Sequence, residues 1–236
     1  MTSDTEDIFV YAPDVPADIP NNDVEQMLQN RIERIGRMKI KNVKYYSKLC
    51  IAVIRMMNED DKIHLISNVQ SAILDSQRGT SIFFTDQLEL DAFIVLDRNA
   101  SKFLSCEQVT SRLKGIFKIN EIVCELISDQ FPNVFHITLN SLDDLVKVAN
   151  TREIQIDNIV VTIYPRAECT FLEDLPPYIT NAKLLSAISS ESGGKELPTT
   201  SLYVQYNNDT GNAIVLTAKF IKTWSIENVV TIDGRK

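Results

Sequence analysis

The chain has 236 residues and a formal net charge of −8, with 44% hydrophobic and 24% charged residues. This composition is typical of globular proteins and argues against extended disorder, while the acidic balance argues against nonspecific binding to polyphosphates. The sequence has no continuous apolar run long enough for a membrane span, and its acidic start (Met1–Asp7) differs from a signal peptide.

One order of elements (strand, helix, strand, strand, helix, strand) recurs three times along the chain. Three short phenylalanine-containing segments open the repeats: Ile8–Val10, Ala92–Ile94 and Thr170–Leu172, at intervals of 84 and 78 residues. A repeat of this period controls the fold prediction. We therefore predict three domains, at residues 6–88, 89–166 and 167–236.

Apolar periodicity and capping residues place the elements of each repeat. In the first repeat we expect strands at 7–11, 38–43, 49–56 and 81–84, and helices at 21–36 and from 58 to about 74. In the second we expect strands at 92–96, 121–127, 134–139 and 158–164, and helices at 106–117 and 142–149. In the third we expect strands at 170–175, 195–199, 201–206 and 229–232, a helix starting at Thr180, and a last helix at 210–226.

Two βαβ halves in each repeat predict an α+β fold of the ferredoxin-like type. Each domain would be a four-stranded antiparallel sheet with both helices on one face. Only seven residues separate Phe84 from Ala92, and five separate Tyr164 from Thr170. We therefore expect the domains to contact one another.

The segment Thr170–Thr180, with Phe171 between apolar neighbours and Pro176-Pro177 before a helix cap, resembles the first-strand signature of the RNA recognition motif (RRM) family. Ser201–Tyr206 partly matches the third-strand signature of that family. The resemblance covers three divergent copies and implies that rings on strands one and three stack on RNA bases.

Strand alternation indicates which side chains face away from the helices. On the open faces we expect six candidate RNA-binding residues: Phe9, Phe93, His136, Phe171, Tyr203 and Gln205. Phe171 and Tyr203 should be neighbours, which makes the third domain the strongest stacking surface. The alternative is that neighbouring domains cover these rings and so enlarge a core.

A local basic stretch lies inside the acidic protein, from the end of the first helix into the next strand. Its candidate phosphate contacts are Arg37, Lys39, Lys41 and Lys44. A solvated helix end with a charged edge strand, which prevents aggregation, is the alternative interpretation.

The last expected helix has an apolar arc much wider than an amphipathic helix requires. Leu216, Phe220 and Trp224 on this arc are candidate residues for binding a partner protein. Contact with the preceding domain would explain the same pattern.

Nothing in the sequence indicates catalysis. His64 and His136 are the only histidines, and phosphate loops, paired-histidine metal spacing and nucleophile elbows are absent. Four scattered cysteines without a Cys-x-x-Cys pair indicate reduced thiols in an intracellular protein of the nucleus or cytoplasm. We expect a nonenzymatic single-stranded RNA-binding protein without cofactor, metal or membrane association. The alternative is a protein-interaction scaffold whose RRM-like domains have lost RNA binding.

Overall fold

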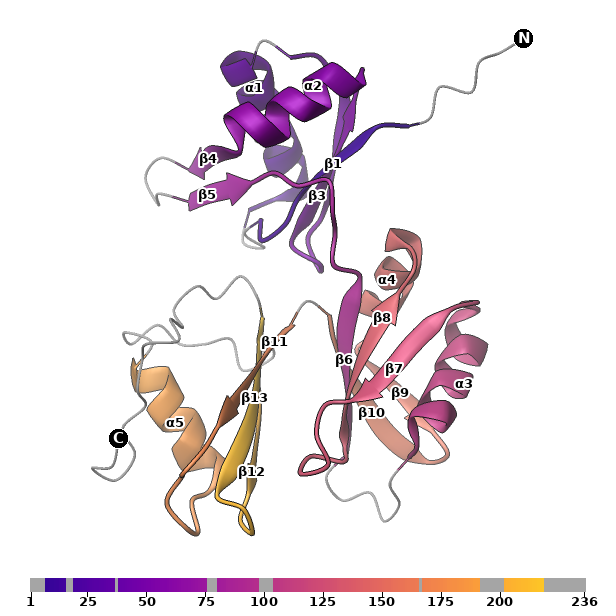
Figure 1. The fold of residues 1–236 in the computed structure, drawn as a ribbon, viewed down its shortest axis with the longest axis vertical. Coiled ribbons are helices and arrows are strands. Elements are labelled where there is room, and N and C mark those ends of the chain that lie inside the picture. Colours follow the sequence, from indigo (N-terminus) through magenta and orange to yellow (C-terminus); the bar gives the residue numbers. More distant parts are fainter. Residues whose placement is uncertain are drawn as a thin grey trace. The chain divides into compact units, whose positions relative to one another are not determined.

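The computed structural model describes residues 7–15, 19–36, 38–75, 80–97, 104–165, 167–191 and 202–218. The chain divides into two compact units, residues 1–89 and 90–236 (Figure 1). The predicted boundary between the second and third domains falls inside the second unit, so the three-domain division stays a prediction. Arg37, Phe220, Trp224 and the strands expected at 195–199 and 229–232 lie outside the described residues.

The first unit has a three-stranded antiparallel sheet and a separate hairpin. Its elements are β1 (Phe9–Ala12), α1 (Asn21–Gly36), β2 (Ile40–Tyr46), β3 (Ile51–Met56), α2 (Glu59–His64), a π-helical turn (Leu65–Val69), β4 (Ser71–Asp75) and β5 (Thr80–Phe83). The strand order is β1-β3-β2, and β4 pairs with β5. The two edges meet at a single bridge, where Tyr11 and Thr85 exchange two backbone hydrogen bonds of 2.8 and 2.9 Å.

Two sequence predictions for the first unit are wrong. The helix expected to run to about residue 74 ends in the π-helical turn, where the Gln70 N–H donates to the Leu65 carbonyl at 2.9 Å and Gln70 has φ 59°. Ser71–Asp75 then forms a strand. The expected fourth strand also pairs differently, because β5 joins β4 and only Thr85 reaches β1.

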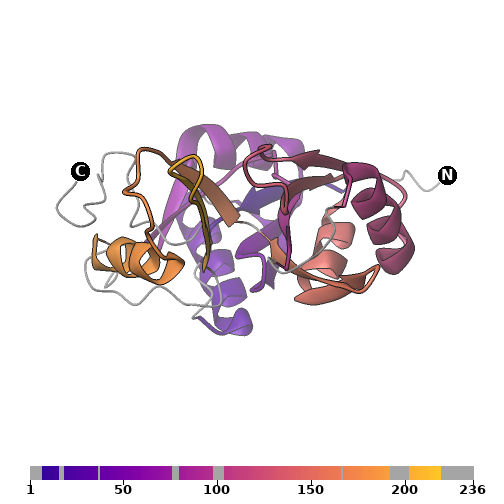
Figure 2. The same cartoon turned by 90° about the horizontal axis from the view of Figure 1, so that it is seen from below.

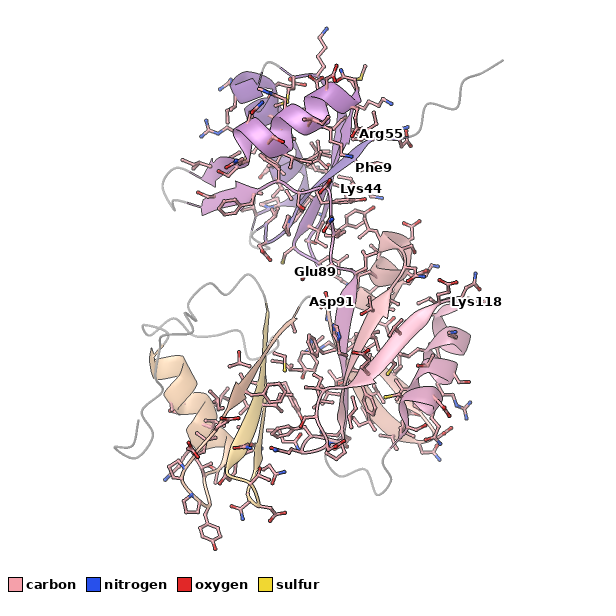
Figure 3. All side chains as sticks on the ribbon, in the orientation of Figure 1. Phe9, Lys44, Arg55, Glu89, Asp91 and Lys118 are labelled. Atoms are coloured by element: carbon pink, nitrogen blue, oxygen red, sulfur yellow. The ribbon has the colours of Figure 1, made fainter. Side chains whose placement is uncertain are left out.

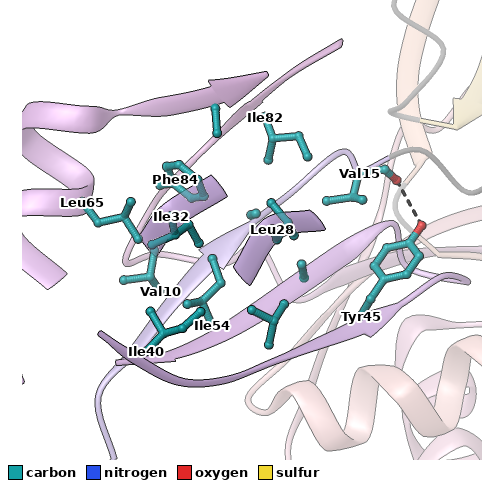
Figure 4. Close-up of a cluster of buried hydrophobic side chains, with 14 of the residues drawn as sticks. Val10, Val15, Leu28, Ile32, Ile40, Tyr45, Ile54, Leu65, Ile82 and Phe84 are labelled. Carbon is teal, nitrogen blue, oxygen red and sulfur yellow. Dashed lines mark hydrogen bonds between the residues drawn. The ribbon is translucent and has the colours of Figure 1, made fainter. Parts of the chain in front are cut away.

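The core of the first unit lies between its sheet, α1 and the hairpin (Figure 4). Alternate residues of β1 and β3, including Val10 and Ile54, point to this side and are fully buried, as are Leu28 and Ile32 one turn apart on α1. The Tyr45 hydroxyl donates to the Val15 carbonyl at 3.3 Å, so a buried polar group is satisfied inside the core.

The second unit begins with a five-stranded antiparallel sheet. Its elements are β6 (Asp91–Leu96), α3 (Cys106–Phe117), β7 (Ile122–Leu126), β8 (Val134–Leu139), α4 (Leu142–Ala149), β9 (Glu153–Ile156) and β10 (Ile159–Pro165). The strand order is β7-β8-β6-β10-β9, with the first and third strands of the repeat at the centre. Figures 1 and 2 show α3 and α4 on the same face of this sheet. The helices predicted at 106–117 and 142–149 are confirmed.

Strand β9 is the element of this sheet that the sequence reading missed. It pairs with β10 through a two-residue turn in which Asp157 and Asn158 have φ 49° and 69°. Two successive positive φ angles define the type I′ turn that favours short hairpins, and Asp and Asn tolerate this conformation. The Asp157-Asn158 dipeptide therefore indicates this turn in the sequence.

A second sheet follows in the same unit. Its elements are β11 (Ala167–Leu172), α5 (Asn181–Glu191), β12 (Leu202–Asn207) and β13 (Asn212–Ala218), and the order is β11-β13-β12. We call it the β11–β13 sheet. In Figures 1 and 2 it lies between α5 and the five-stranded sheet. The expected start of a helix at Thr180 is confirmed, because the Thr180 hydroxyl accepts from the Lys183 N–H at 3.2 Å.

The helix predicted at 210–226 is wrong over its described part, since 212–218 is the central strand β13. Residues 208–211 form the hairpin turn, with Gly211 at φ +71° and its N–H donating to the Asn207 carbonyl at 3.0 Å. The predicted third strand is therefore the lateral strand β12, and β13 takes the position between β11 and β12.

Candidate nucleic-acid interface

The first unit presents aromatic and basic side chains on the face of its sheet that is turned away from α1. The pairing places Phe9 opposite Arg55 and Tyr11 opposite Val53, while Lys44 lies opposite Val53 from the other side. Alternation adds Tyr46, two residues after Lys44. We call the set the aromatic–basic face: Phe9, Tyr11, Lys44, Tyr46 and Arg55. Figure 3 labels three of them, Phe9, Lys44 and Arg55, which project from adjacent strands.

The side chains of the aromatic–basic face differ in their exposure and partners. Phe9 is 36% exposed, which is high for a phenylalanine on a sheet, and Tyr11 is half-buried. The Lys44 ammonium lies 4.8 Å from the centre of the Tyr46 ring, a favourable cation–π distance. The Arg55 guanidinium forms an ion pair with Asp7. The face thus combines an exposed ring with two cationic side chains, of which Arg55 is paired with Asp7 and Lys44 lies over Tyr46.

The predicted basic stretch divides between two faces. Lys39 and Lys41 are exposed beside the start of β2, where a bulge separates Ile40 from Asn42. Arg31 instead points to the hairpin and donates to the Ile73 carbonyl at 3.0 Å. Lys41 in β2 and Lys39 just before it are exposed cations of this sheet, whereas Arg31 on α1 belongs to another surface.

The face of the five-stranded sheet turned away from α3 and α4 is covered by the β11–β13 sheet. One apolar cluster joins the two sheets: Phe93, Val95, Phe131, Val134, Ala167, Tyr203, Ile214 and Leu216. We call it the inter-sheet cluster. Phe131, from the loop between β7 and β8, is fully buried in it. The alternative prediction that a neighbouring domain covers the rings is therefore correct for this face.

Phe93 and His136, two predicted stacking residues, lie at this covered face. Phe93 is 7% exposed, and its ring centre is 5.0 Å from that of His136. His136 Nε2 lies 3.2 Å from a carboxylate oxygen of Asp91. The expectation that Phe93 is an exposed ring is wrong, and the half-buried His136 is engaged by its neighbours.

Polar contacts fix the two sheets of the second unit in one arrangement. The Asn133 amide donates to the Tyr203 hydroxyl at 2.9 Å, and that hydroxyl donates to Gln205 Oε1. Gln130 accepts from three hairpin residues: its carbonyl from the Asn207 amide at 3.1 Å, and its Oε1 from the Asn212 amide at 2.8 Å and the Thr210 hydroxyl at 3.4 Å. The contact is therefore specific as well as apolar.

The predicted pair of exposed rings in the third repeat is wrong. Tyr203 is only 8% exposed in the inter-sheet cluster, and Gln205 is half-buried beside it. Phe171 is 48% exposed, with its ring centre 6.3 Å from that of Phe131. Phe171 pairs with Ile214 and Tyr203 with Leu216, so strand β13 separates the two rings. Phe171 stands without the companion ring that the sequence predicted.

A shallow depression of about 240 Å³ borders Phe171. Ser128, Gln130, Glu173 and Asn212 contribute its polar lining, and Leu172 and Ile127 add apolar contact. The Asn212 amide is already bound to Gln130.

Leu216 is the described member of the predicted partner-binding helix. It is fully buried in β13, within the inter-sheet cluster. The prediction of an exposed partner-binding Leu216 is wrong because its segment forms a central strand.

Sequence reasoning missed Tyr11, Tyr46 and Phe131. Tyr11 follows Phe9 by two residues and Tyr46 follows Lys44 by two, so strict alternation already places each pair on one face. Phe131 lies in a loop between strands, where alternation gives no information.

The described residues contain no group of three or more His, Cys, Asp or Glu side chains arranged to hold a metal ion. None of their helices is both long and apolar enough to cross a membrane.

Comparison with solved structures gives matches of low overall similarity. The RNA binding domain of Hrp1 in complex with RNA has a TM-score of 0.26 and 11% identity, covering 66% of this chain and 93% of that chain. The N-terminal 3 RNA binding domains of the yeast splicing factor Prp24 have a TM-score of 0.28 and 12% identity, covering 91% of this chain and 89% of that chain. No protein-family model and no curated protein sequence matches this chain.

Proposed function

We propose that the protein is a nonenzymatic single-stranded RNA-binding protein that binds RNA through the aromatic–basic face of its first unit. The observation that carries the proposal is the exposed Phe9 ring on β1, on the same sheet face as Arg55 of the adjacent strand β3 and Lys44 of β2 beyond it. Exposed rings on a sheet stack on unpaired bases, and adjacent cations contact the phosphates. This combination suits a single strand, whose bases are free to lie on the sheet.

The proposal moves the main stacking surface from the third repeat, where the sequence placed it, to the first. Tyr203 is buried and Phe93 is covered, which leaves Phe171 as a single exposed ring in the second unit's inter-sheet region. The first unit adds Tyr11 and Tyr46 to Phe9, and it also contains the exposed Lys39 and Lys41. Phe171 is proposed as an auxiliary contact.

The expected affinity is moderate. Stacking contributes about 1–3 kcal/mol per base, so Phe9 and Tyr11 together supply about 2–6 kcal/mol. Dissociation constants of about 1 mM and 1 μM correspond to about 4 and 8 kcal/mol. We therefore expect a dissociation constant in the micromolar to millimolar range at low salt. Few cations accompany the rings, so phosphate contacts add little to this affinity.

Fluorescence anisotropy of the full chain with labelled single-stranded RNA of random sequence tests the proposal. Phe9→Ala should weaken binding about 5- to 150-fold, the equivalent of about 1–3 kcal/mol. Lys44→Ala should lower the slope of log affinity against log salt by about 0.7, as expected for one phosphate contact on a single strand. Phe83→Ala is the matched control, since Phe83 is 59% exposed in the same unit but lies on the hairpin.

The outcome that contradicts RNA binding is the absence of any interaction at low salt with the wild-type chain. Equal losses from Phe9→Ala and Phe83→Ala would also refute the assignment of the face, because they would show a general effect of removing exposed rings.

The second candidate function is a protein-interaction scaffold built from RRM-like folds. One observation favours it: the inter-sheet cluster shows that a sheet face of this chain is already used for contact between protein surfaces. Under this proposal the wild type fails to bind RNA, and Phe9→Ala removes a protein partner in affinity capture. Phe220 and Trp224 remain proposed partner contacts. If the Trp224→Glu variant captures the same set of partners as the wild type, these contacts are contradicted.

A further inference from the structure

An acidic side chain borders the exposed ring of the aromatic–basic face. Asp7 precedes Phe9 by two residues, and its carboxylate forms an ion pair with Arg55 of β3. Between them, the Ile8 carbonyl accepts from the Met56 N–H at 2.8 Å, so the chain stays against β3 just before β1 begins. Residues two apart in an extended chain point to the same side and lie about 6.6 Å apart. The Asp7 carboxylate therefore lies beside the Phe9 ring.

Arg55 borders the same ring from the adjacent strand. It lies opposite Phe9 in the pairing of β1 with β3 (Figure 3), and the Cβ atoms of opposite residues are about 4.5–5.5 Å apart. The Arg55 and Asp7 side chains are 38% and 39% exposed. A flat ligand lying on Phe9 can therefore reach both members of the ion pair with its edge.

The ion pair presents hydrogen-bond acceptors next to donors. An ionised carboxylate only accepts, through two oxygens with about four lone-pair positions, and a guanidinium only donates. Arginine has five N–H donors, so a guanidinium bound to one carboxylate still has donors for a second partner. The base edge that matches this arrangement has two neighbouring donors for Asp7 and an acceptor for Arg55.

We propose that the Asp7–Arg55 pair selects guanine among the bases that stack on Phe9. The Watson–Crick edge of guanine carries two adjacent donors, N1–H and the N2 amine, followed by the O6 acceptor. The Asp7 carboxylate accepts from the two nitrogens, and the Arg55 guanidinium donates to O6. This inference rests on the proposed RNA-binding function and adds to it the kind of base that is bound.

The other three bases fit the same pair less well. Adenine and cytosine each offer one exocyclic amine beside a ring nitrogen that accepts, and uracil offers N3–H between two carbonyl oxygens. Each of them turns an acceptor toward a carboxylate oxygen of Asp7. A site built to hydrogen-bond one set of groups discriminates strongly against a ligand that leaves them unpaired.

The ion pair also prepares the site for its ligand. Asp7 is held by Arg55 before any base is bound, so less side-chain freedom is lost on binding. The ring supplies stacking, which every base satisfies equally, and the ion pair supplies the discrimination.

Competition measured by fluorescence anisotropy tests the proposal with the full chain. The competitors are single-stranded oligouridylates that carry one central guanosine, inosine or adenosine. The guanosine competitor should bind about 5- to 150-fold more tightly than the adenosine competitor, as expected for one bidentate contact. Inosine lacks the N2 amine, so its affinity should lie between the two.

Asp7→Asn should remove the preference, because a carboxamide replaces one of the two acceptors by a donor. The ratio of the guanosine and adenosine affinities should approach about 1, the loss of that one bidentate contact. Asp60→Asn is the matched control, since it removes the same charge from an exposed position in the first turn of α2 and should preserve the ratio. A general electrostatic effect would change all affinities together and leave the ratio unaltered.

Equal affinity of the wild type for the guanosine and adenosine competitors overturns the guanine inference and leaves the proposed RNA binding intact. Equal affinity for guanosine and inosine overturns it as well, because the N2 amine would then make no contact. The absence of binding to every oligonucleotide contradicts the proposed function itself, and with it this inference. The wild-type series decides the question even if Asp7→Asn fails to fold.

Discussion

Replacing Tyr203 by phenylalanine removes a single oxygen atom and distinguishes two interpretations of this residue. A phenylalanine stacks on a base as a tyrosine does, so a stacking platform would tolerate the change. The structure instead places the Tyr203 hydroxyl in a buried contact, where it accepts from Asn133 at 2.9 Å and donates to Gln205. We therefore expect Tyr203→Phe to destabilise the second unit.

The size of the effect follows from the partner that is left behind. Asn133 is 5% exposed, and without the hydroxyl its amide retains only a long contact of 3.4 Å to the Leu96 carbonyl. A neutral hydrogen bond contributes about 1 kcal/mol, and leaving a buried donor unsatisfied costs about 1–3 kcal/mol. The expected decrease in the free energy of unfolding is about 1–3 kcal/mol.

Chemical denaturation of the full chain measures this decrease when unfolding is monitored with a probe specific to the second unit. The midpoint should fall while the dependence on denaturant stays the same, since a single oxygen does not alter the surface exposed on unfolding. A double-mutant cycle with Asn133→Ala should show coupling of about 0.5–3 kcal/mol, because the two residues share one contact. Tyr178→Phe is the control, because Tyr178 is 83% exposed.

A decrease below about 0.5 kcal/mol, the usual range for surface substitutions, would refute the reasoning. It would mean that the Tyr203 hydroxyl reaches water in solution and that the β11–β13 sheet does not cover the five-stranded sheet as described.

Three further predictions concern local geometry and titration. Gly211→Ala should destabilise the β12–β13 hairpin by about 1 kcal/mol or more in thermal unfolding, since Gly211 has φ +71° and an added Cβ meets the Leu175 carbonyl at 3.4 Å. Ser105→Ala should cost about 0.5–2 kcal/mol through loss of the cap of α3, and Ser105→Asp should restore most of it in the same denaturation assay. Burial raises the pKa of Cys169 from 9.0 to about 11; stability from the neutral thiol is therefore present below pH 9 and lost as the pH rises through 11, and the alkylation rate of Cys169 should increase over the same range.

The second repeat was predictable because its local signals agree with one another. Ser105 and Ser141 each precede an amphipathic helix and cap it, at the starts that the sequence predicts for the helices 106–117 and 142–149. The strands on either side alternate, with Phe135 and Ile137 turned toward the helices. The sequence did not reveal what covers the opposite face, because burial by a neighbouring sheet depends on contacts between residues about 70 positions apart, such as Asn133 and Tyr203.

The prediction for the third repeat is wrong from the turn between β12 and β13 onward. Asn207–Thr210 contains the residues that cap helices, and the sequence interpretation placed a helix start there. The same side chain can serve a hairpin: Asn207 Oδ1 accepts from the Asp209 N–H at 3.0 Å and the Thr210 N–H at 3.4 Å. The apolar residues that follow, 213–216, are buried on both faces of the strand, which is typical of a central strand. The apolar arc that these residues would form on a helix is wider than an amphipathic helix requires, and this excess was the evidence in the sequence against a helix.

The distribution of aromatic residues explains how one repeat pattern serves two purposes. A ring on the open face of a sheet gains free energy either by stacking on a base or by leaving water against another protein surface, and both require the same alternation. What separates them is the chemistry around the ring. Phe93 is surrounded by Val95, Val134 and Ile214 in the inter-sheet cluster, whereas Phe9 pairs across the strands with Arg55. Charged groups resist burial in an apolar cluster, and the Arg55–Asp7 ion pair beside Phe9 is partly exposed to water. We therefore propose the sheet face of the first unit as the one that takes a polyanionic, base-bearing ligand, because the equivalent face of the second unit is covered in the inter-sheet cluster.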